Sequence, residues 1–223
     1  MSGPDRKPFV ERVRCALGRG AADAVPAPPA VDDAVARLAG EGDDLVAMFE
    51  ARATEVGMAV QRCAADDLAT ALVERLEALG VQRIVAGLAR VDADGSLVEA
   101  IQAAGIAVDD WRGDRTMAAG YDAGAGVTDV RAAIAETGTL VYASDADHGR
   151  GLMLVPPIHL AVVRTRDIIP DMLDYMRQMG AASPAELPAS QTLITGPSKT
   201  ADIEGVLVTG VHGPGAVHVL LVA

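Results

Sequence analysis

The sequence predicts an α/β fold built on a mixed, mostly parallel sheet. Half of the 223 residues are hydrophobic, which is enough to bury a sizeable core. Between residues 58 and 108, short apolar runs alternate with longer amphipathic segments, a rhythm typical of a sheet with helices on its faces. Beyond residue 139, apolar runs follow one another across loops that are too short for a parallel crossover, which favours some antiparallel pairing.

The first 30 residues are expected to form a helical arm beside this domain. Apolar side chains recur at helical spacing within residues 7–17, and Gly18 follows as a helix stop. Residues 21–29 are rich in alanine and proline, which is typical of a linker. We therefore divide the chain into an N-terminal helix with its linker, residues 1–30, and one α/β domain, residues 31–223.

Periodicity predicts the remaining elements in chain order. Apolar residues at helical spacing mark helices, and short runs of β-branched residues mark strands. Thr128 is expected to cap the helix that ends at Gly138, and the loop before the apolar run at Leu152 is short enough for antiparallel pairing. The expected helices are residues 31–38, 44–56, 66–79, 96–104, 129–136 and 168–179. The expected strands are residues 58–62, 83–86, 106–108, 139–143, 158–163, 192–195 and 216–222.

Composition excludes several classes of function. The formal net charge of -12, the aromatic content of 3% and the lack of a basic cluster disfavour nucleic acid and anionic membranes as partners. Cys15 and Cys63 make no CxxC motif, so a disulfide framework or a protein-held iron-sulfur cluster is not expected. No apolar stretch is long enough for a signal peptide or a membrane span, and we expect a cytoplasmic protein.

All four histidines lie after residue 147, but their spacing does not indicate a metal site. His218 lies among valines and leucines and is expected to be a hydrogen-bonded core residue. His148, in a loop of aspartate and glycine, is expected to face solvent. His159 and His212, beside proline or glycine at the ends of apolar runs, stay open between a structural role and a role in a site.

The stretch Glu136-Thr-Gly-Thr139 places one carboxylate and two hydroxyls around a helix-to-strand turn. It is a candidate site, although Gly138 also serves to end a helix and Thr139 suits the strand that starts there. If residues 139–143 run antiparallel to residues 192–195, this turn and the loop after residue 195 converge on one cleft.

That second loop, Gly196-Pro-Ser-Lys-Thr-Ala-Asp-Ile-Glu204, carries more polar groups than a simple turn requires. We expect Ser198 or Thr200 to cap a one-turn helix here, with two carboxylates near its start. The loop lacks the glycine directly before Lys199 that a nucleotide-binding P-loop requires. Binding of a small anion or a phosphate group stays open.

Five motifs together resemble one known family. They are Gly126-Val-Thr128, Ala133-Ile-Ala-Glu-Thr-Gly-Thr139, Pro156-Pro-Ile-His159, Gly196-Pro-Ser-Lys-Thr-Ala-Asp-Ile-Glu204 and Gly210-Val-His-Gly-Pro214. In this order, over roughly residues 45–223, they resemble the LUD-domain proteins, and among these the lactate utilization protein C (LutC/YkgG-like) branch. The resemblance implies a three-layer α/β/α fold, related to the NagB/RpiA/CoA transferase-like proteins and to formyltetrahydrofolate cyclo-ligases.

The resemblance also implies a component of a multi-subunit, iron-sulfur-dependent system that oxidises L-lactate to pyruvate. The iron-sulfur clusters are expected in a partner protein, and no cofactor is expected on this chain, which also lacks a GxGxxG motif after an early strand. Two alternatives stay open. One is a stand-alone enzyme of the same fold that acts on a phosphorylated or CoA-linked substrate, and the other is a non-catalytic scaffold.

The candidate residues come from these motifs. The catalytic candidates are Glu136, Asp202, Glu204 and His212. The candidates for binding a small anion or a phosphate-type ligand are Thr137, Gly138, Thr139, His159, Gly196, Ser198, Lys199, Thr200 and Gly213. We expect Glu136, His212 and residues 198–204 to face one another.

Overall fold

The computed structural model describes two compact units, Met1–Ala36 and Arg37–Ala223, and each is treated by itself. The described residues are 6–20, 27, 29–30, 32–112, 116–202 and 206–223. In the first unit, α1 (Arg6–Ala16) confirms the predicted N-terminal helix. The second element of this unit is η1 (Asp33–Val35), a single 3-10 turn. The division of the chain at residue 30 stays a prediction.

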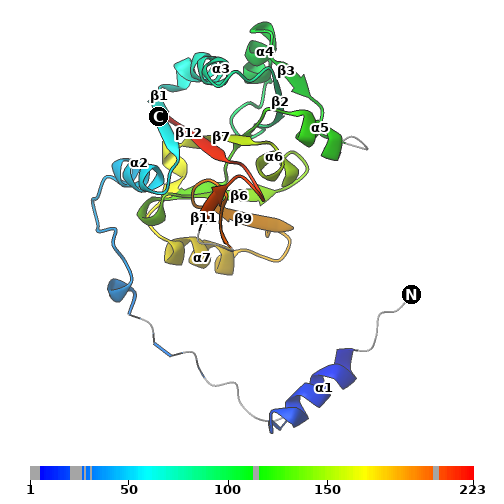
Figure 1. Cartoon of the computed structure of the whole chain (residues 1–223). Helices are drawn as coiled ribbons and strands as arrows, with labels where there is room; N and C mark the ends of the chain where they lie inside the picture. The colour runs from blue at the N-terminus through cyan, green and yellow to red at the C-terminus, as the bar shows by residue number, and fades with distance from the viewer. Residues whose placement is uncertain (1–5, 21–26, 28, 31, 113–115, 203–205) are drawn as a thin grey trace. The chain divides into compact units, whose positions relative to one another are not determined.

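A six-stranded sheet lies at the centre of the second unit (Figure 1). All its neighbouring strands run parallel. In spatial order the strands are β1 (Ala59–Cys63), β12 (Ala216–Val222), β7 (Ile158–Arg164), β4 (Ala125–Asp129), β2 (Arg83–Gly87) and β3 (Ala107–Asp109). The carboxyl ends of all six strands therefore lie at one edge of the sheet.

One face of this sheet is covered by α3 (Leu68–Ala78), which follows the short η2 (Ala65–Asp67), and by α4 (Ser96–Ala103). Alternate residues of a strand point to the same face, so one set from each strand packs under these helices. Leu72 and Ile101 of the helices and Ile84, Leu160 and Leu220 of the strands are fully buried there. This apolar layer holds the helices on the sheet.

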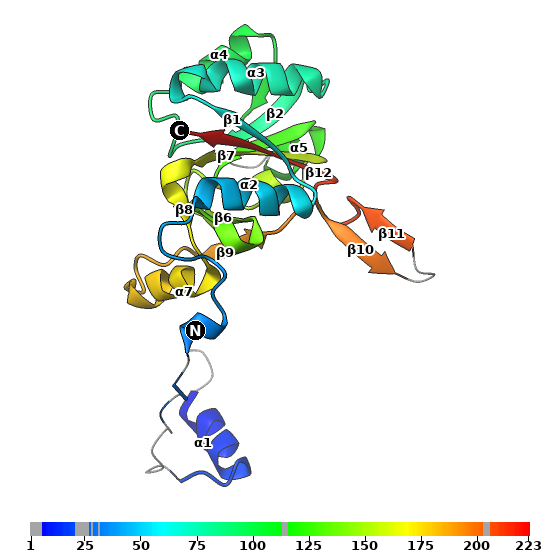
Figure 2. The ribbon, with the colours of Figure 1, turned by 90° about the vertical axis from the view of Figure 1, so that its left-hand side faces the viewer.

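The other face packs against α2 (Leu45–Glu55), α5 (Thr116–Asp122), α6 (Gly151–Leu154) and a second sheet (Figures 1 and 2). In spatial order, the second sheet contains β8 (Ile168–Ile169), β5 (Ala132–Ile134), β6 (Thr139–Ser144) and β9 (Ser190–Ile194). The turn η4 (Ala135–Thr137) joins β5 to β6, and η5 (Thr165–Asp167) joins β7 to β8. The helix α7 (Met172–Ala181) packs on the far side of this sheet through Tyr175.

The predicted α/β class with a mostly parallel sheet is confirmed, but the antiparallel pairs lie outside the central sheet, in a second sheet that also contains the parallel pair β5–β8 and in a separate hairpin. The central sheet is wholly parallel, whereas β6 pairs antiparallel with both β5 and β9. Residues 139–143 thus run antiparallel to residues 192–195, as the convergence of the two polar loops requires. A further antiparallel pair, β10 (Lys199–Asp202) and β11 (Val206–Thr209), extends from the rest of the unit as a hairpin (Figure 2).

The predicted helix at residues 129–136 is wrong. Asp129 ends β4, and Ala132–Ile134 form β5, which pairs with β6 and β8. Every residue of both strands is buried, so these small side chains lie between packed layers instead of on one side of a helix. Thr128 therefore caps no helix and lies inside β4.

The one-turn helix expected within residues 196–204 is also wrong. Residues 199–202 pair with β11, since the Ser198 carbonyl accepts the backbone N–H of Gly210 at 2.9 Å and brings the two strands together. The predicted helix at residues 31–38 is reduced to η1, because the backbone N–H groups of Leu38 and Ala39 bond to the carboxylate of Glu136.

Two further segments differ from the prediction. The apolar run at Leu152 begins in the helix α6, so it does not pair with β6. The segment at residues 168–179 divides into β8 and α7, because Pro170 lies between them and the Asp171 carboxylate caps α7 by accepting the N–H of Asp174 at 2.7 Å. Among the described residues, no helix has the length and apolar character needed to cross a bilayer.

Candidate functional site

The turn Glu136-Thr-Gly-Thr139 joins three parts of the second unit. The Glu136 carboxylate accepts the backbone N–H groups of Leu38 and Ala39, the latter at 2.7 Å. The hydroxyls of Thr137 and Thr139 lie 2.7 Å apart, and that of Thr139 lies 2.8 Å from the hydroxyl of Thr195. These polar groups therefore bond to each other, to β9's end and to the segment before α2.

Gly138 is required at this turn for two reasons. Its φ is +62°, a left-handed conformation that glycine adopts without strain. A Cβ atom at this position would lie 2.3 Å from the backbone nitrogen of Ala53 and 2.6 Å from its Cα in α2. The glycine thus allows the turn to lie directly against the backbone of α2.

The loop at residues 196–199 and the loop at residues 210–214 lie together. The backbone N–H of Ser198 donates to the Pro214 carbonyl at 2.9 Å, and a Cβ on Gly213 would lie 3.3 Å from the Ser198 Cβ. The Lys199 ammonium donates to the Val56 carbonyl at 3.1 Å. The lysine and the serine backbone are thus engaged in contacts within the chain.

The remaining candidates of these two loops do not gather around Glu136. Gly196 has a φ of +91° and lies against the Val56 carbonyl, where a Cβ would approach to 2.5 Å. Thr200 lies in β10 and His212 is exposed, and among the described residues no hydrogen bond or ion pair joins His212 to Glu136. Asp202 ends β10, and Glu204 lies outside the described residues. That Glu136, His212 and residues 198–204 face one another stays a prediction.

The burial and hydrogen bonding of the four histidines differ in part from what the sequence predicts. His159 is fully buried in β7 and its Nε2 lies 2.9 Å from the Thr128 hydroxyl. Burial lowers the pKa of His159 to about 4, so the ring is neutral at pH 7. His218 lies in the predicted strand β12, but it is half-buried instead of a core residue, and its Nδ1 has no hydrogen-bond partner among the described residues. His148, predicted to face solvent, is only 2% exposed.

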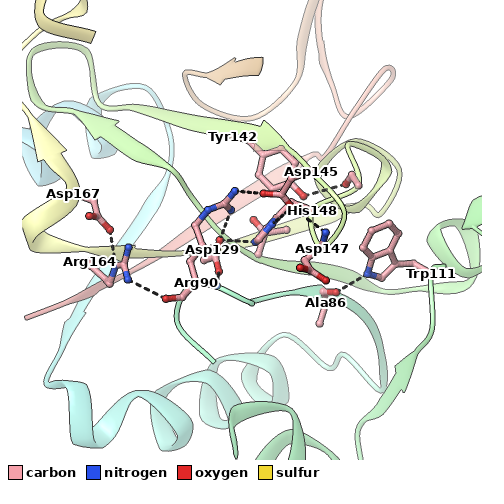
Figure 3. Close-up of polar contacts among 12 residues, drawn as sticks. Ala86, Arg90, Trp111, Asp129, Tyr142, Asp145, Asp147, His148, Arg164 and Asp167 are labelled. Carbon is pink, nitrogen blue, oxygen red and sulfur yellow. Dashed lines mark hydrogen bonds and ion pairs between the residues drawn. The ribbon is translucent and has the colours of Figure 1, made fainter. Parts of the chain in front are cut away.

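His148 belongs to a buried cluster of charged residues that the sequence did not indicate (Figure 3). Its Nδ1 lies 2.6 Å from the Asp145 carboxylate, and its Nε2 lies 2.8 Å from that of Asp129, within ion-pair distance but outside hydrogen-bond geometry. Arg90 donates to Asp129 from its backbone nitrogen at 2.7 Å and from its guanidinium at 2.8 Å. The same guanidinium donates to Asp145 at 2.6 Å.

The cluster lies at the carboxyl edge of the parallel sheet. Asp129 is the last residue of β4, Arg90 follows β2, and the loop after β6 supplies Asp145 and His148. Arg164, the last residue of β7, donates to the Arg90 carbonyl at 2.9 Å (Figure 3). In open α/β sheets, ligands bind at this edge, in the crevice beyond the carboxyl ends of the strands.

A cavity of about 470 Å³ opens at this edge. Three arginines contribute to its lining, Arg90, Arg164 and Arg166, together with one acidic residue, Asp94, and apolar side chains such as Leu97 and Val222. The Arg164 guanidinium bonds to Asp167 at 2.5 Å, whereas Arg166 is exposed and has no ion-pair partner within the described part of the chain. Guanidinium groups bind carboxylates and phosphates in a bidentate manner. The cavity therefore has the chemistry for an anionic ligand with an apolar part.

The described residues contain no group of three or more His, Cys, Asp or Glu side chains arranged to hold a metal ion. Asp129 would have been recognised from the sequence if residues 125–129 had been assigned to a strand, because a carboxylate at a strand's carboxyl end is a familiar signal. No comparable signal marks Arg90 or His148, which contact Asp129 only in the folded chain.

Comparisons with known proteins agree with the motifs. The family model described as the LUD domain matches residues 46–222. The chain is 32% identical over 176 residues to lactate utilization protein C of Halalkalibacterium halodurans, covering 77% of this chain and 76% of the relative. It is 37% identical over 125 residues to lactate utilization protein C of Bacillus subtilis, covering 53% of this chain and 52% of that one.

Two other similarities extend this comparison. The protein YkgG of Escherichia coli is 33% identical over 108 residues, covering 48% of this chain and 47% of the relative. A crystal structure of a DUF162 family protein from Deinococcus radiodurans has a TM-score of 0.58 and 26% identity, covering 81% of this chain and 97% of that one. The alignments thus span about half the length of the Bacillus subtilis and Escherichia coli proteins and three quarters of the Halalkalibacterium protein.

Proposed function

Because the chain belongs to the LUD-domain family, as its five motifs predict, we propose that it acts in lactate utilization. Its role is that of one component of a multi-subunit, iron-sulfur-dependent system that oxidises L-lactate to pyruvate. The names of its relatives support a part in lactate utilization. The oxidation releases two electrons and two protons, and a cluster that accepts electrons uses about four thiolates. This chain has two cysteines, so a partner protein supplies the clusters.

The ligand of this chain is a small anion bound in the carboxyl-edge cavity. The observation that carries this part of the proposal is Arg166, which faces the cavity without an ion-pair partner among the described residues. Lactate and pyruvate both carry a carboxylate, which suits a guanidinium group, and a methyl group, which suits Leu97 and Val222. In this arrangement the chain binds and orients the anion, and the electrons leave through the partner.

The first test is whether this chain, purified under mild conditions, carries an iron-sulfur protein with it and whether the isolated complex oxidises lactate. Omission of the chain from the complex is expected to abolish lactate oxidation. An undiminished rate of oxidation by the partners alone would overturn the proposed role.

The second test addresses the cavity. Arg166→Ala removes a charge-assisted contact worth about 1.5–3 kcal/mol, so the KM of the complex for lactate should rise roughly 10- to 100-fold. Arg177→Ala on α7 is the matched control, since this surface arginine pairs with Asp174 and neither residue lines the cavity, and the KM of this variant should not change. Equal KM values for both variants would remove the cavity from the proposal.

A second candidate function is a stand-alone enzyme of this fold that acts on a phosphorylated or CoA-linked substrate. The volume of the cavity favours it, because pockets of roughly 300–1,000 Å³ hold ligands much larger than lactate. Thermal stability measured with lactate, pyruvate, CoA, ATP and sugar phosphates separates the two. Stabilisation by CoA, ATP or a sugar phosphate alone favours the second candidate, whereas stabilisation by lactate or pyruvate favours the first.

A further inference from the structure

We propose that His148 is a positioning residue for the anion cavity: through Asp129 and Asp145 it holds Arg90 and Arg164 in their binding arrangement, and this hold depends on protonation of the imidazole. The inference rests on the proposed function, in which the cavity binds an anion. It assigns to a buried histidine a role that neither its loop nor the family motifs indicate.

The contacts form a closed ring of four residues. Asp129 and Asp145 each contact both Arg90 and His148, at distances between 2.6 and 2.8 Å (Figure 3). The Asp129 side chain is 1% exposed and that of His148 is 2% exposed, so water cannot replace the contact between these two, whereas Asp145 lies at the solvent-facing side of the ring. An unpaired buried charge is costly, and each member therefore fixes the positions of the other three.

Arg90 connects the ring of four residues to the cavity, because it belongs to both. Asp129 holds both the backbone nitrogen and the guanidinium of this residue, which fixes the loop after β2 as well as the side chain. The Arg90 carbonyl then accepts the guanidinium N–H of Arg164 at 2.9 Å. Both arginines line the cavity, so a displacement of the ring moves two of the three arginines in its lining.

The short distances to two carboxylates favour a doubly protonated imidazole. Each ring nitrogen of His148 faces a carboxylate oxygen, and neutral histidine has only one N–H to offer. When His148 is protonated, the negative charges of Asp129 and Asp145 are balanced by the positive charges of Arg90 and the imidazolium. Loss of the proton leaves one net negative charge beside Arg90 and places a nitrogen lone pair against a carboxylate.

The other groups around His148 do not reverse this preference. Burial of the imidazole disfavours its charge, but the carboxylates of Asp129 and Asp145 outweigh burial and the repulsion from Arg90, so the pKa of His148 is raised. The Tyr142 ring stands edge-on at 6.2 Å, and its hydroxyl donates to the Gly149 carbonyl. At the outer rim, Asp147 pairs with Arg112 at 2.9 Å.

The experiment measures the dissociation constants of sulfate and pyruvate by calorimetry between pH 5.5 and 9, where neither probe changes its charge. In the wild-type chain, both probes should bind about 5- to 100-fold more weakly once His148 loses its proton, as expected for coupled sites. His148→Gln should bind weakly at every pH. His212→Gln, which changes an exposed histidine, should keep the wild-type profile.

A second measurement does not depend on any ligand. The backbone amide of Arg90 donates to Asp129, so its protection from hydrogen exchange, corrected for intrinsic rates, should fall as His148 deprotonates and should be low throughout in His148→Gln. Protection that is independent of pH and equal in both proteins overturns the positioning role. The same pH profile of binding in wild type and His148→Gln also overturns it. If protection changes as expected but neither anion binds, the positioning role stands and the proposed anion cavity fails.

Discussion

Replacement of Gly138 by alanine should destabilise the protein strongly. The left-handed backbone at φ +62° costs a residue with a Cβ about 1–2 kcal/mol. The new methyl group would also lie 2.3 Å from the nitrogen of Ala53, and overpacking of this kind costs about 1–3 kcal/mol. The expected loss in the free energy of unfolding is therefore about 2–5 kcal/mol, a large part of the total of about 5–15 kcal/mol for a typical protein.

Gly80→Ala is the matched control for this substitution. Gly80 has a φ of +67°, and a Cβ there would meet no atom within 4 Å. This variant carries the backbone cost alone, about 1–2 kcal/mol, and both substitutions reduce the entropy of the unfolded chain equally. The difference between the two variants thus isolates the close approach of the turn to α2.

Urea denaturation followed by circular dichroism measures both free energies. An equal loss for Gly138→Ala and Gly80→Ala would refute the argument from close packing. Growth on lactate separates packing from ligand binding, because a packing role predicts that growth falls only as the folded fraction falls. A Gly138→Ala protein of normal stability that fails to support growth would instead favour the ligand-binding role that the motif suggests.

Three further outcomes are expected. Asp129→Asn removes a buried negative charge that contacts both Arg90 and His148, and it should lower the free energy of unfolding by about 3–5 kcal/mol in urea titrations. A loss under about 1 kcal/mol would contradict the role of Asp129 in the cluster. Folding raises the pKa of His148, so protonated His148 stabilises the folded protein fully at pH values below the pKa of the unfolded chain, about 6.5. This stabilisation is lost as the pH rises through the pKa of His148 in the folded protein. Unfolding measured across this range should show the decline in wild type and in His212→Gln, but not in His148→Gln. Thr139→Val removes two hydroxyl contacts and should cost about 1–3 kcal/mol in thermal unfolding, whereas an unchanged midpoint would contradict their role.

Apart from β4, the strands of the central sheet could be predicted because they carry their own signal. Residues 158–163 and 216–222 are nearly continuous apolar runs, as expected of strands that are covered on both faces. The helix at Leu45–Glu55 follows an aspartate whose carboxylate accepts the N–H groups of Val46 and Ala47. In these segments, local pattern and tertiary packing favour the same structure.

The segment from residue 125 to residue 134 carries no such signal. Four of its ten residues are alanine or glycine, and Asp129 and Arg131 interrupt the apolar ones, so the segment shows neither a helical nor a strand period. Its extended conformation depends on pairing with strands elsewhere in the chain, Ile84–Gly87 for β4 and Thr139–Val141 for β5. The same reason explains why the buried cluster was missed, since Asp129 and Arg90 are 39 positions apart in the sequence.

The polar motifs and the charged cluster are connected through one strand. β6 begins at Thr139, where the turn with Gly138 is held against α2 and the threonine hydroxyl bonds to Thr195. The same strand ends at Ser144, and the loop that follows brings Asp145 and His148 to Arg90. The turn holds the first residue of β6 in place. It therefore also affects where the end of this strand places Asp145 and His148. We therefore expect substitutions at the turn to alter anion binding in the cavity to the extent that they shift or loosen β6.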